Sequence, residues 1–132
     1  MKNDVIIVGG GMVGAAMALK LAKQGCVVTV IEQQHVDFDA VLASEQLDLR
    51  VSAINRFSEQ LFAELGILDT LLSKRHAPYC RLAAFEQTKQ TLLFDAKDIN
   101  YEYLGHIIEN KLIQAALWQA FSSHNITVRS GL

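Results

Sequence analysis

The stretch VIIVGGGMVGAAMALKLAKQG, residues 5–25, contains the change of pattern that decides the fold. Its first four residues are apolar and β-branched, which is typical of a strand buried on both faces of a parallel sheet. Three glycines follow, and from Met12 the pattern becomes that of a helix whose small residues recur at every fourth position. Gly25 stands where a left-handed C-terminal cap is expected, and Val27–Ile31 has the pattern of a second buried strand. The sequence therefore predicts a strand, helix, strand unit.

The glycines between the strand and the helix match the G-x-G-x-x-G pattern of dinucleotide-binding proteins. Gly9 permits a tight turn out of the strand, Gly11 lets the backbone approach a pyrophosphate, and Gly14 lets the helix pack closely on the sheet. Phosphate groups are then expected beside Met12 and Val13, where the unpaired N–H groups and the dipole of the helix favour negative charge. The pattern is short and common by itself, so its position between a strand and a helix is what gives it weight.

Glu32 ends the second strand, and with Gln33 it completes the predicted cofactor-binding residues of this unit. Its carboxylate is expected to accept hydrogen bonds from the ribose hydroxyls of an adenosine. A carboxylate there repels a 2′-phosphate, and Gln33 and Gln34 supply no Arg to bind one, so these residues favour FAD or NAD over NADP. Two other interpretations are a simple glycine turn beside an exposed acid and a secretory signal peptide. The signal peptide conflicts with Asp4 directly before the apolar run and with Lys20 inside the helix.

Composition and charge exclude several classes of protein. The chain has 132 residues, of which 51% are hydrophobic and 20% charged, with a net charge of -2, as in one globular domain rather than a disordered chain. The charges are interspersed, so nucleic acid is not an expected partner. No apolar run approaches the roughly 20 residues that cross a bilayer, so any membrane contact is expected to be peripheral. Cys26 and Cys80 fit no metal or redox spacing and are interpreted as reduced, semi-buried thiols of a cytoplasmic protein.

Beyond the first unit, the pattern predicts a surface connection, two helices, a hairpin, a long helix and a last strand. Their expected ranges are Gln33–Asp48 for the connection, Asn55–Gly66 and Leu68–Lys74 for the helices, Tyr79–Glu86 and Thr91–Phe94 for the hairpin with its turn near Gln87–Gln90, Ile107–Ser122 for the long helix and Ile126–Ser130 for the strand. The long helix is expected to expose Glu109, Lys111 and Gln114 on its polar side. The predicted fold is α/β: a Rossmann-like unit with a parallel sheet and an inserted helical and hairpin excursion over 48–100.

Two further segments carry a family resemblance: LRVSAINRFSEQLFAELGILDTLLSKR at 49–75 and YLGHIIENKLIQAALWQA at 103–120. Together with the glycine motif, they closely resemble the ubiquinone-biosynthesis hydroxylases, which are FAD-dependent aromatic monooxygenases related to para-hydroxybenzoate hydroxylase. The resemblance runs from about Asp4 to the end of the chain. It implies FAD as the cofactor, NAD(P)H as the reductant, and transfer of one oxygen atom of O₂ to the ring of a polyprenylated phenol or quinol. The flavin supplies that chemistry and the protein positions it.

The resemblance also implies roles for residues outside the glycine motif. Arg50 matches an arginine that reaches the cofactor near its ribityl and pyrophosphate portion, a task suited to a planar guanidinium. The alternative interpretation of Arg50 is a solvated surface charge. Asn110 matches a position that lies against the cofactor, although it could also be a polar residue on an amphipathic helix. His106 is interpreted as structural or loop-lining. The other three histidines are isolated, and no catalytic acid, catalytic base or metal ligand is predicted.

The chain departs from the family in its length. Full-length members continue for well over twice this length and carry a Gly-Asp and an Asp-Gly motif that contact FAD, and neither motif occurs in this sequence. Residues 1–132 are therefore predicted to be the N-terminal part of an FAD-binding domain, inactive alone and prone to self-association through apolar faces of the sheet and of the 107–122 helix. A self-contained NAD- or FAD-binding module and an interaction module remain as alternatives. The parent enzyme is expected in the cytoplasm, with peripheral attachment to the inner membrane or to a biosynthetic complex left open.

Overall fold

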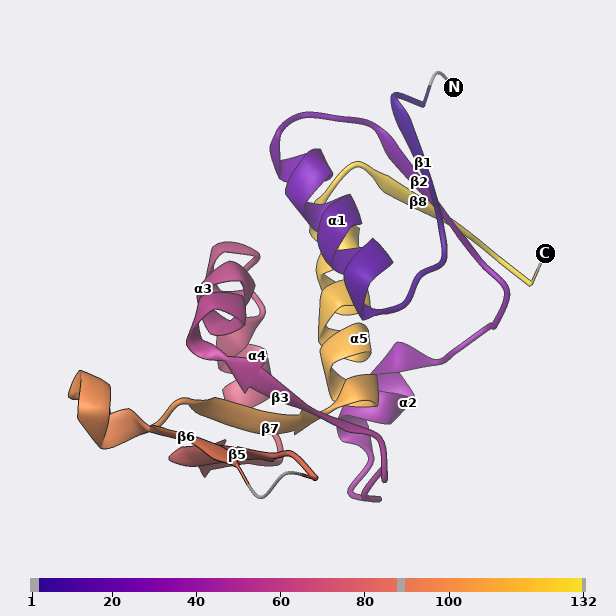
Figure 1. Cartoon of the computed structure of the whole chain (residues 1–132). Helices are drawn as coiled ribbons and strands as arrows, with labels where there is room; N and C mark the ends of the chain where they lie inside the picture. The colour runs from indigo at the N-terminus through magenta and orange to yellow at the C-terminus, as the bar shows by residue number, and fades with distance from the viewer. Residues whose placement is uncertain (1–2, 88–89, 132) are drawn as a thin grey trace.

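The structure is a computed structural model that describes residues 3–87 and 90–131 (Figure 1). The helices are α1 (Met12–Lys23), α2 (Phe38–Ala43), α3 (Arg56–Glu64), α4 (Leu68–Leu72) and α5 (Asn110–Gln119), with 3₁₀ turns at Ala96–Ile99 and Ala120–Ser123. The strands are β1 (Val5–Val8), β2 (Val28–Glu32), β3 (Val51–Asn55), β4 (His76–Tyr79), β5 (Arg81–Phe85), β6 (Thr91–Asp95), β7 (Gly105–Glu109) and β8 (Ile126–Ser130). Across the described residues they form three sheets, in the orders β1-β2-β8, β3-β7-β4 and β5-β6.

The first sheet is parallel and contains the strand, helix, strand unit predicted from the glycine stretch. β2 lies in its centre and pairs with β1 on one side and with β8 on the other. Gly25 has a φ of 93°, so it ends α1 in the left-handed conformation expected of it. The predicted α/β fold, with a parallel sheet built from the strands near Val5, Val27 and Ile126, is confirmed.

Helix α5 forms the centre of the hydrophobic core. It packs against α1, α2, α4 and β7, and so connects the parallel sheet with the second sheet (Figure 1). Its buried residues are Leu112, Ile113, Ala115, Ala116 and Leu117. They meet the buried face of α1, where Ala18 and Leu19 have no exposed surface, and Val28 and Val30 of β2. Burial of these apolar side chains is the main force that holds the two sheets around one core.

The predicted helix over Ile107–Ser122 is wrong at its start. Gly105–Glu109 is instead β7, the central strand of an antiparallel sheet between β3 and β4. The local sequence GHIIE contains two β-branched residues, which favour a strand, and pairing with both β3 and β4 satisfies its backbone groups on both edges. The helix begins only at Asn110, which is therefore its first residue and does not lie one turn inside it.

Three other elements differ from the sequence-based expectation. The connection over Gln33–Asp48 contains α2, whose Asp37 cap accepts the Ala40 N–H and whose Leu42 reaches the core. β3 was not predicted. The expected strand Tyr79–Glu86 is divided, because β4 pairs with β7 whereas β5 forms the predicted hairpin with β6. Residues 88–89 of the expected turn lie outside the described residues.

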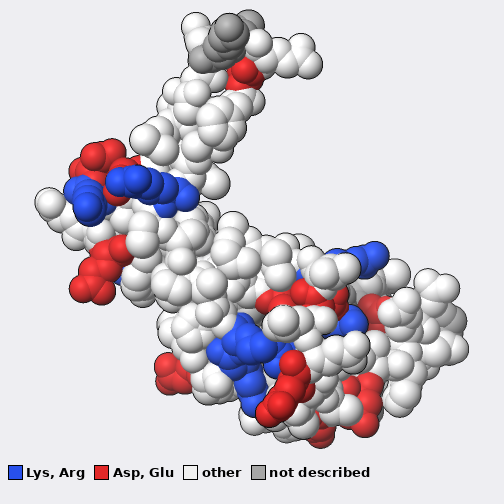
Figure 2. All heavy atoms as spheres, turned by 90° about the horizontal axis from the view of Figure 1, so that it is seen from below, with Lys and Arg blue, Asp and Glu red and all other residues white. Residues whose placement is uncertain are grey.

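The surface carries charges of both signs, interspersed over the face seen in Figure 2. The expected apolar face of the 107–122 helix is covered, because α5 is the centre of the core. Large exposed apolar residues lie instead on β1, as Val8, and on the β5–β6 hairpin, as Phe85 and Leu93. Cys80 is exposed and not semi-buried as predicted, whereas Cys26 is half-buried. Among the described helices, none combines the length and the apolar character needed to span a membrane.

Candidate functional site

The glycine turn connects β1 to α1 at the carboxyl edge of the parallel sheet. Gly9 has a φ of 102°, which is strained for any residue with a side chain, and its N–H donates to the Ile31 carbonyl at 2.8 Å. Gly11 is the residue before α1, and no side chain among the described residues caps the helix there. The first turn of α1 also contains no acidic residue. The N–H groups at the start of α1 are therefore available to an anion.

Gly11 and Gly14 meet different surroundings, as their predicted roles require. A Cβ built on Gly14 would lie 2.0 Å from the Gly9 carbonyl oxygen and 3.3 Å from the Ile7 side chain. A Cβ on Gly11 would meet no atom within 4 Å. Glycine is thus required at position 14, because a side chain there would collide with the turn between β1 and α1. Gly11 instead keeps open a space outside the fold, where a ligand can approach the backbone.

Glu32 faces this turn from the end of β2. Its Oε2 accepts a hydrogen bond from the Gly10 N–H at 2.6 Å, and its Oε1 accepts one from the Gln34 N–H at 3.0 Å. The N–H groups of Gln34 and Gly10 hold the pKa of the Glu32 carboxyl below its usual value. An ionised carboxylate has about four acceptor positions, so acceptor capacity remains for the hydroxyls of a ribose. Gln33 lies exposed beside it.

A cleft of about 410 Å³ begins at the glycine turn and brings together residues far apart in the sequence. Its lining includes Gly11 and Met12 from the start of α1, Arg50 before β3, and Asn110 from the start of α5. The Asn110 N–H donates to the Arg50 carbonyl at 2.9 Å, which fixes the position of Arg50 relative to α5. The structure thus places Arg50 and Asn110 beside the nucleotide motif. Val13 is exposed on α1 and does not line the cleft.

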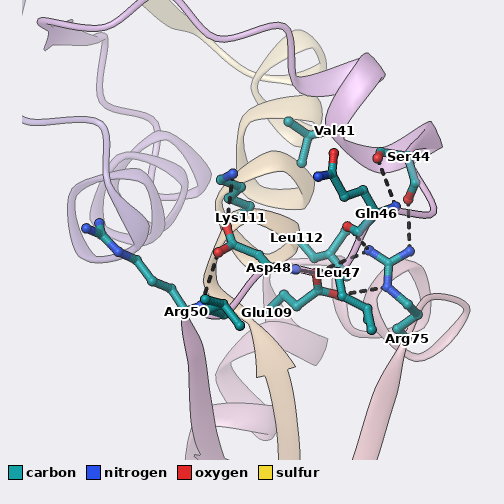
Figure 3. Close-up of a pocket in the computed structure, with 11 residues that line it drawn as sticks. Val41, Ser44, Gln46, Leu47, Asp48, Arg50, Arg75, Glu109, Lys111 and Leu112 are labelled. Carbon is teal, nitrogen blue, oxygen red and sulfur yellow. Dashed lines mark hydrogen bonds and ion pairs between the residues drawn. The ribbon is translucent and has the colours of Figure 1, made fainter.

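A buried carboxylate, Glu109, holds the segment before β3 in place. The sequence analysis assigned this residue to a solvated helix face. Glu109 is only 6% exposed, and its Oε2 accepts the Arg75 Nε–H at 2.8 Å. Its Oε1 accepts the Asp48 N–H at 2.7 Å and a second Arg75 N–H at 3.2 Å. The hydrogen bond from Arg75 lowers the pKa of Glu109, and Glu109 in turn raises the pKa of Arg75. Figure 3 shows this network lining a neighbouring cavity of about 540 Å³.

The same network orders the segment that carries Arg50. Arg75 also donates to the carbonyls of Ser44 and Gln46, at 2.9 and 3.2 Å. Asp48 accepts the Arg50 N–H at 3.1 Å and forms an ion pair with Lys111 at 3.0 Å. In Figure 3 the Arg50 side chain points away from Glu109 and Arg75, so its guanidinium remains outside the network. The segment is fixed through its backbone, which leaves the Arg50 side chain available.

The sequence analysis missed both Glu109 and Arg75. It extended the last helix over Glu109 and placed this residue on the polar side, whereas the helix begins one residue later, at Asn110. The residues IIE directly before Asn110 carried the signal, since an acid that follows two β-branched apolar residues fits the end of a buried strand. Arg75 had no local signal. Its partner lies 34 positions away and is brought near only by the pairing of β4 with β7.

His106 lies in the interior, away from the cleft. It is 6% exposed, and its Nδ1 lies 2.5 Å from Oε1 of Glu59, which is also buried. The pair connects β7 with α3, so the position agrees with the structural interpretation of His106. Within the described residues, no group of three or more His, Cys, Asp or Glu side chains could hold a metal ion.

Comparison with known proteins finds related sequences. Residues 4–67 match the family model described as FAD dependent oxidoreductase. The chain is 42% identical over 128 residues to the 3-demethoxyubiquinol 3-hydroxylase of Escherichia coli (strain K12), an alignment that covers 96% of this chain and 32% of that protein. The chain is thus similar in sequence to ubiquinone-biosynthesis hydroxylases. It is also 37% identical over 119 residues to the mitochondrial ubiquinone biosynthesis monooxygenase COQ6 of Xenopus tropicalis, covering 86% of this chain and 25% of that protein.

Solved structures with the same fold include a p-nitrophenol monooxygenase and PqsL. The p-nitrophenol 4-monooxygenase PnpA of Pseudomonas putida DLL-E4 superposes with a TM-score of 0.69 at 20% identity, over 99% of this chain and 32% of that one. PqsL of P. aeruginosa, in complex with 2-aminobenzoylacetate, superposes with a TM-score of 0.68 at 16% identity, over 98% and 33%. The chain spans about a third of the length of these proteins and of the E. coli hydroxylase. The predicted family resemblance, and FAD as the cofactor of that family, are confirmed.

Proposed function

We propose that this chain forms the ADP-binding portion of the FAD site of a ubiquinone-biosynthesis hydroxylase. The observation that carries the proposal is the uncapped start of α1, which faces an open space at Gly11 and lies across the turn from the ionised Glu32. Those groups suit the two ends of an ADP moiety, because amide N–H groups attract its pyrophosphate and a carboxylate accepts from its ribose. As part of a longer FAD-binding domain, the chain accounts for one portion of that site.

The residues fit FAD in distinct ways. The amides at the start of α1 bind the pyrophosphate, with Met12 beside them and Val13 exposed on the same turn. Arg50 lies in the cleft that starts at Gly11, where its guanidinium can neutralise phosphate charge with two parallel N–H donors. Asn110 holds Arg50 through its backbone N–H, and its side-chain Oδ1 accepts a hydrogen bond from the Ser52 hydroxyl at 2.6 Å, which fixes the position of its side-chain amide.

The chemistry of the proposed parent enzyme belongs to its cofactor. FAD, when bound and reduced by NAD(P)H, supplies the transfer of one oxygen atom of O₂ to an electron-rich ring. The substrate class proposed for the parent is a polyprenylated phenol or quinol, supported by the names of relatives such as the E. coli 3-demethoxyubiquinol 3-hydroxylase. We place the parent in the cytoplasm, with peripheral contact to the inner membrane, from which a prenylated substrate would enter.

Calorimetric titration of the 132-residue chain with FAD, ADP, NADH and NADP⁺ tests this proposal. We expect FAD and ADP to bind, and NADP⁺ to bind at least tenfold more weakly because its 2′-phosphate meets the Glu32 carboxylate. With NAD(P)H, O₂ and a prenylated phenol, the chain alone is expected to form no hydroxylated product. Absence of binding by both FAD and ADP would overturn the proposal. NADH binding tighter than FAD binding would favour the self-contained NAD module.

The variant Glu32→Gln tests the ribose contact. A glutamine side chain has one acceptor oxygen, so it cannot accept from both the Gly10 and the Gln34 N–H groups and still serve two ribose hydroxyls. We expect the affinity for ADP to fall roughly tenfold, while the discrimination against NADP⁺ becomes smaller. Glu102→Gln, which makes the same change at an exposed position outside the cleft, is the matched control and is expected to leave the ADP affinity unchanged. Unchanged ADP affinity in Glu32→Gln would remove Glu32 from the site.

A further inference from the structure

One glycine of the triplet has no role in the G-x-G-x-x-G pattern, which leaves position 10 free. The structure nevertheless buries Gly10 and engages both polar groups of its backbone with side chains. Its N–H donates to Glu32, as described above. Its carbonyl accepts two hydrogen bonds from α5, one from Trp118 Nε1 at 2.7 Å and one from Gln114 Nε2 at 2.9 Å. The centre of the glycine turn is therefore held from both sides by residues outside it.

Trp118 is itself fixed in place. Its ring stacks on Phe38 of α2 with 4.4 Å between the ring centroids and lies 5.4 Å from the ring of Phe121. Indole has a single N–H donor, and here that donor is directed at the Gly10 carbonyl. Gln114 lies one helical turn earlier on the same face of α5, so the two donors act together. Both side chains are half-buried, and Gln114 also lines the cleft.

The indole also explains why residue 10 is glycine. A Cβ built on Gly10 would lie 2.4 Å from Cζ2 of Trp118 and 3.1 Å from the Glu32 carboxylate. The first of these distances is too short for two non-bonded carbon atoms, so an alanine at position 10 requires the indole to move. The identity of residue 10 is thus coupled to Trp118, 108 positions away.

We propose that Trp118 and Gln114 are positioning residues that hold the Gly10 carbonyl and so direct the following amides, at the start of α1, toward the pyrophosphate of FAD. This rests on the proposed function for the identity of the ligand, but the clamp on the turn exists without it. A preorganised turn spends less binding energy on ordering itself, so the clamp is expected to raise the affinity for the cofactor.

Two variants remove one donor each. Trp118→Phe keeps an aromatic ring between Phe38 and Phe121 but removes the indole N–H and the Cζ2 atom, and Gln114→Met keeps length without a donor. We expect each to lower FAD affinity roughly three- to tenfold in calorimetric titrations. Hydrogen exchange of the amides of residues 9–14, measured without cofactor, is expected to accelerate in both. Gln119→Met, an exposed position on the same helix, is the matched control and is expected to change neither quantity.

A double-mutant cycle tests the coupling directly. Gly10→Ala alone is expected to lower FAD affinity by tenfold or more, whereas in the Trp118→Phe background the same change is expected to cost less than threefold, because the smaller ring leaves room for the methyl group. Faster exchange together with coupled effects supports the clamp. Equal effects of Gly10→Ala in both backgrounds, with exchange unchanged in Trp118→Phe, would overturn it. If the unmodified chain binds neither FAD nor ADP while the exchange accelerates as expected, the clamp stands and the proposed function fails.

Discussion

Gly14→Ala is expected to destabilise the chain by about 3 kcal/mol and to lower its affinity for FAD by at least tenfold. The added Cβ would lie 2.0 Å from the Gly9 carbonyl oxygen, an atom of the backbone that no rotamer change can remove. α1 must therefore move away from the turn, which carries its first amides away from the phosphate position. Urea unfolding followed by far-UV circular dichroism measures the stability, and calorimetric titration measures the affinity.

Gly11→Ala is the matched variant, because it adds the same methyl group within the same motif. Its Cβ would meet no atom of the chain within 4 Å, and Gly11 has an ordinary φ of -65°. We expect the free energy of unfolding to change by less than about 0.5 kcal/mol. FAD affinity should still fall roughly tenfold, since the methyl group occupies the space through which the pyrophosphate approaches. Equal loss of stability in the two variants would contradict the separate roles of these glycines.

The glycine unit was predictable because every signal in it is local. The strand, the turn and α1 are consecutive, and the change in period from continuous apolar to helical marks each boundary. Gly25 likewise sits at the end of its own helix, where the positive φ follows from the C-terminal cap. The nucleotide motif and its two strands could therefore be predicted without knowledge of any long-range contact.

The second sheet was harder to predict because its strands are specified by distant partners. β7 has an apolar pattern that suits a helix as well as a strand, and only pairing with both β3 and β4 decides between them. The error at this boundary also placed Glu109 in solvent, although it is one of the most buried carboxylates of the chain. Gln114 was likewise assigned to a polar face, whereas it binds the Gly10 carbonyl.

The family resemblance supplied what periodicity could not. Arg50 and Asn110 have no local pattern that points to a cofactor, and the resemblance selected them by their match to other sequences. The structure then brings both to the cleft that begins at Gly11. Trp118 lies inside the 103–120 segment that resembles the family, but its contact with the turn depends on how α5 packs beside α1. That packing is visible only in three dimensions.

Glu109→Gln is expected to destabilise the chain by about 2 kcal/mol at neutral pH, because it weakens charge-assisted hydrogen bonds from Arg75 to a buried acceptor. The hydrogen bond from Arg75 lowers the folded-state pKa of Glu109 below the ordinary Glu value of 4.5, so the carboxylate stabilises the fold at pH values above 4.5. That stabilisation is lost as the pH falls through the folded-state pKa. Urea midpoints of the original chain and the variant should therefore differ at pH 7 and converge in acid.

The effect should extend to the cofactor site, because Glu109 holds the backbone of Asp48 and, through Arg75, the carbonyls of Ser44 and Gln46. Release of this segment lets Arg50 leave the cleft, so we expect FAD affinity to fall about fivefold in Glu109→Gln. Glu64→Gln is the matched control, since the pKa of Glu64 is also lowered, by Lys20, but the pair lies about half exposed on the surface. Solvent screens such a pair, and its removal should leave both stability and affinity nearly unchanged. A pH dependence that is the same for Glu109→Gln as for the original chain would show that Glu109 does not hold this segment, and Arg50 would then need another support.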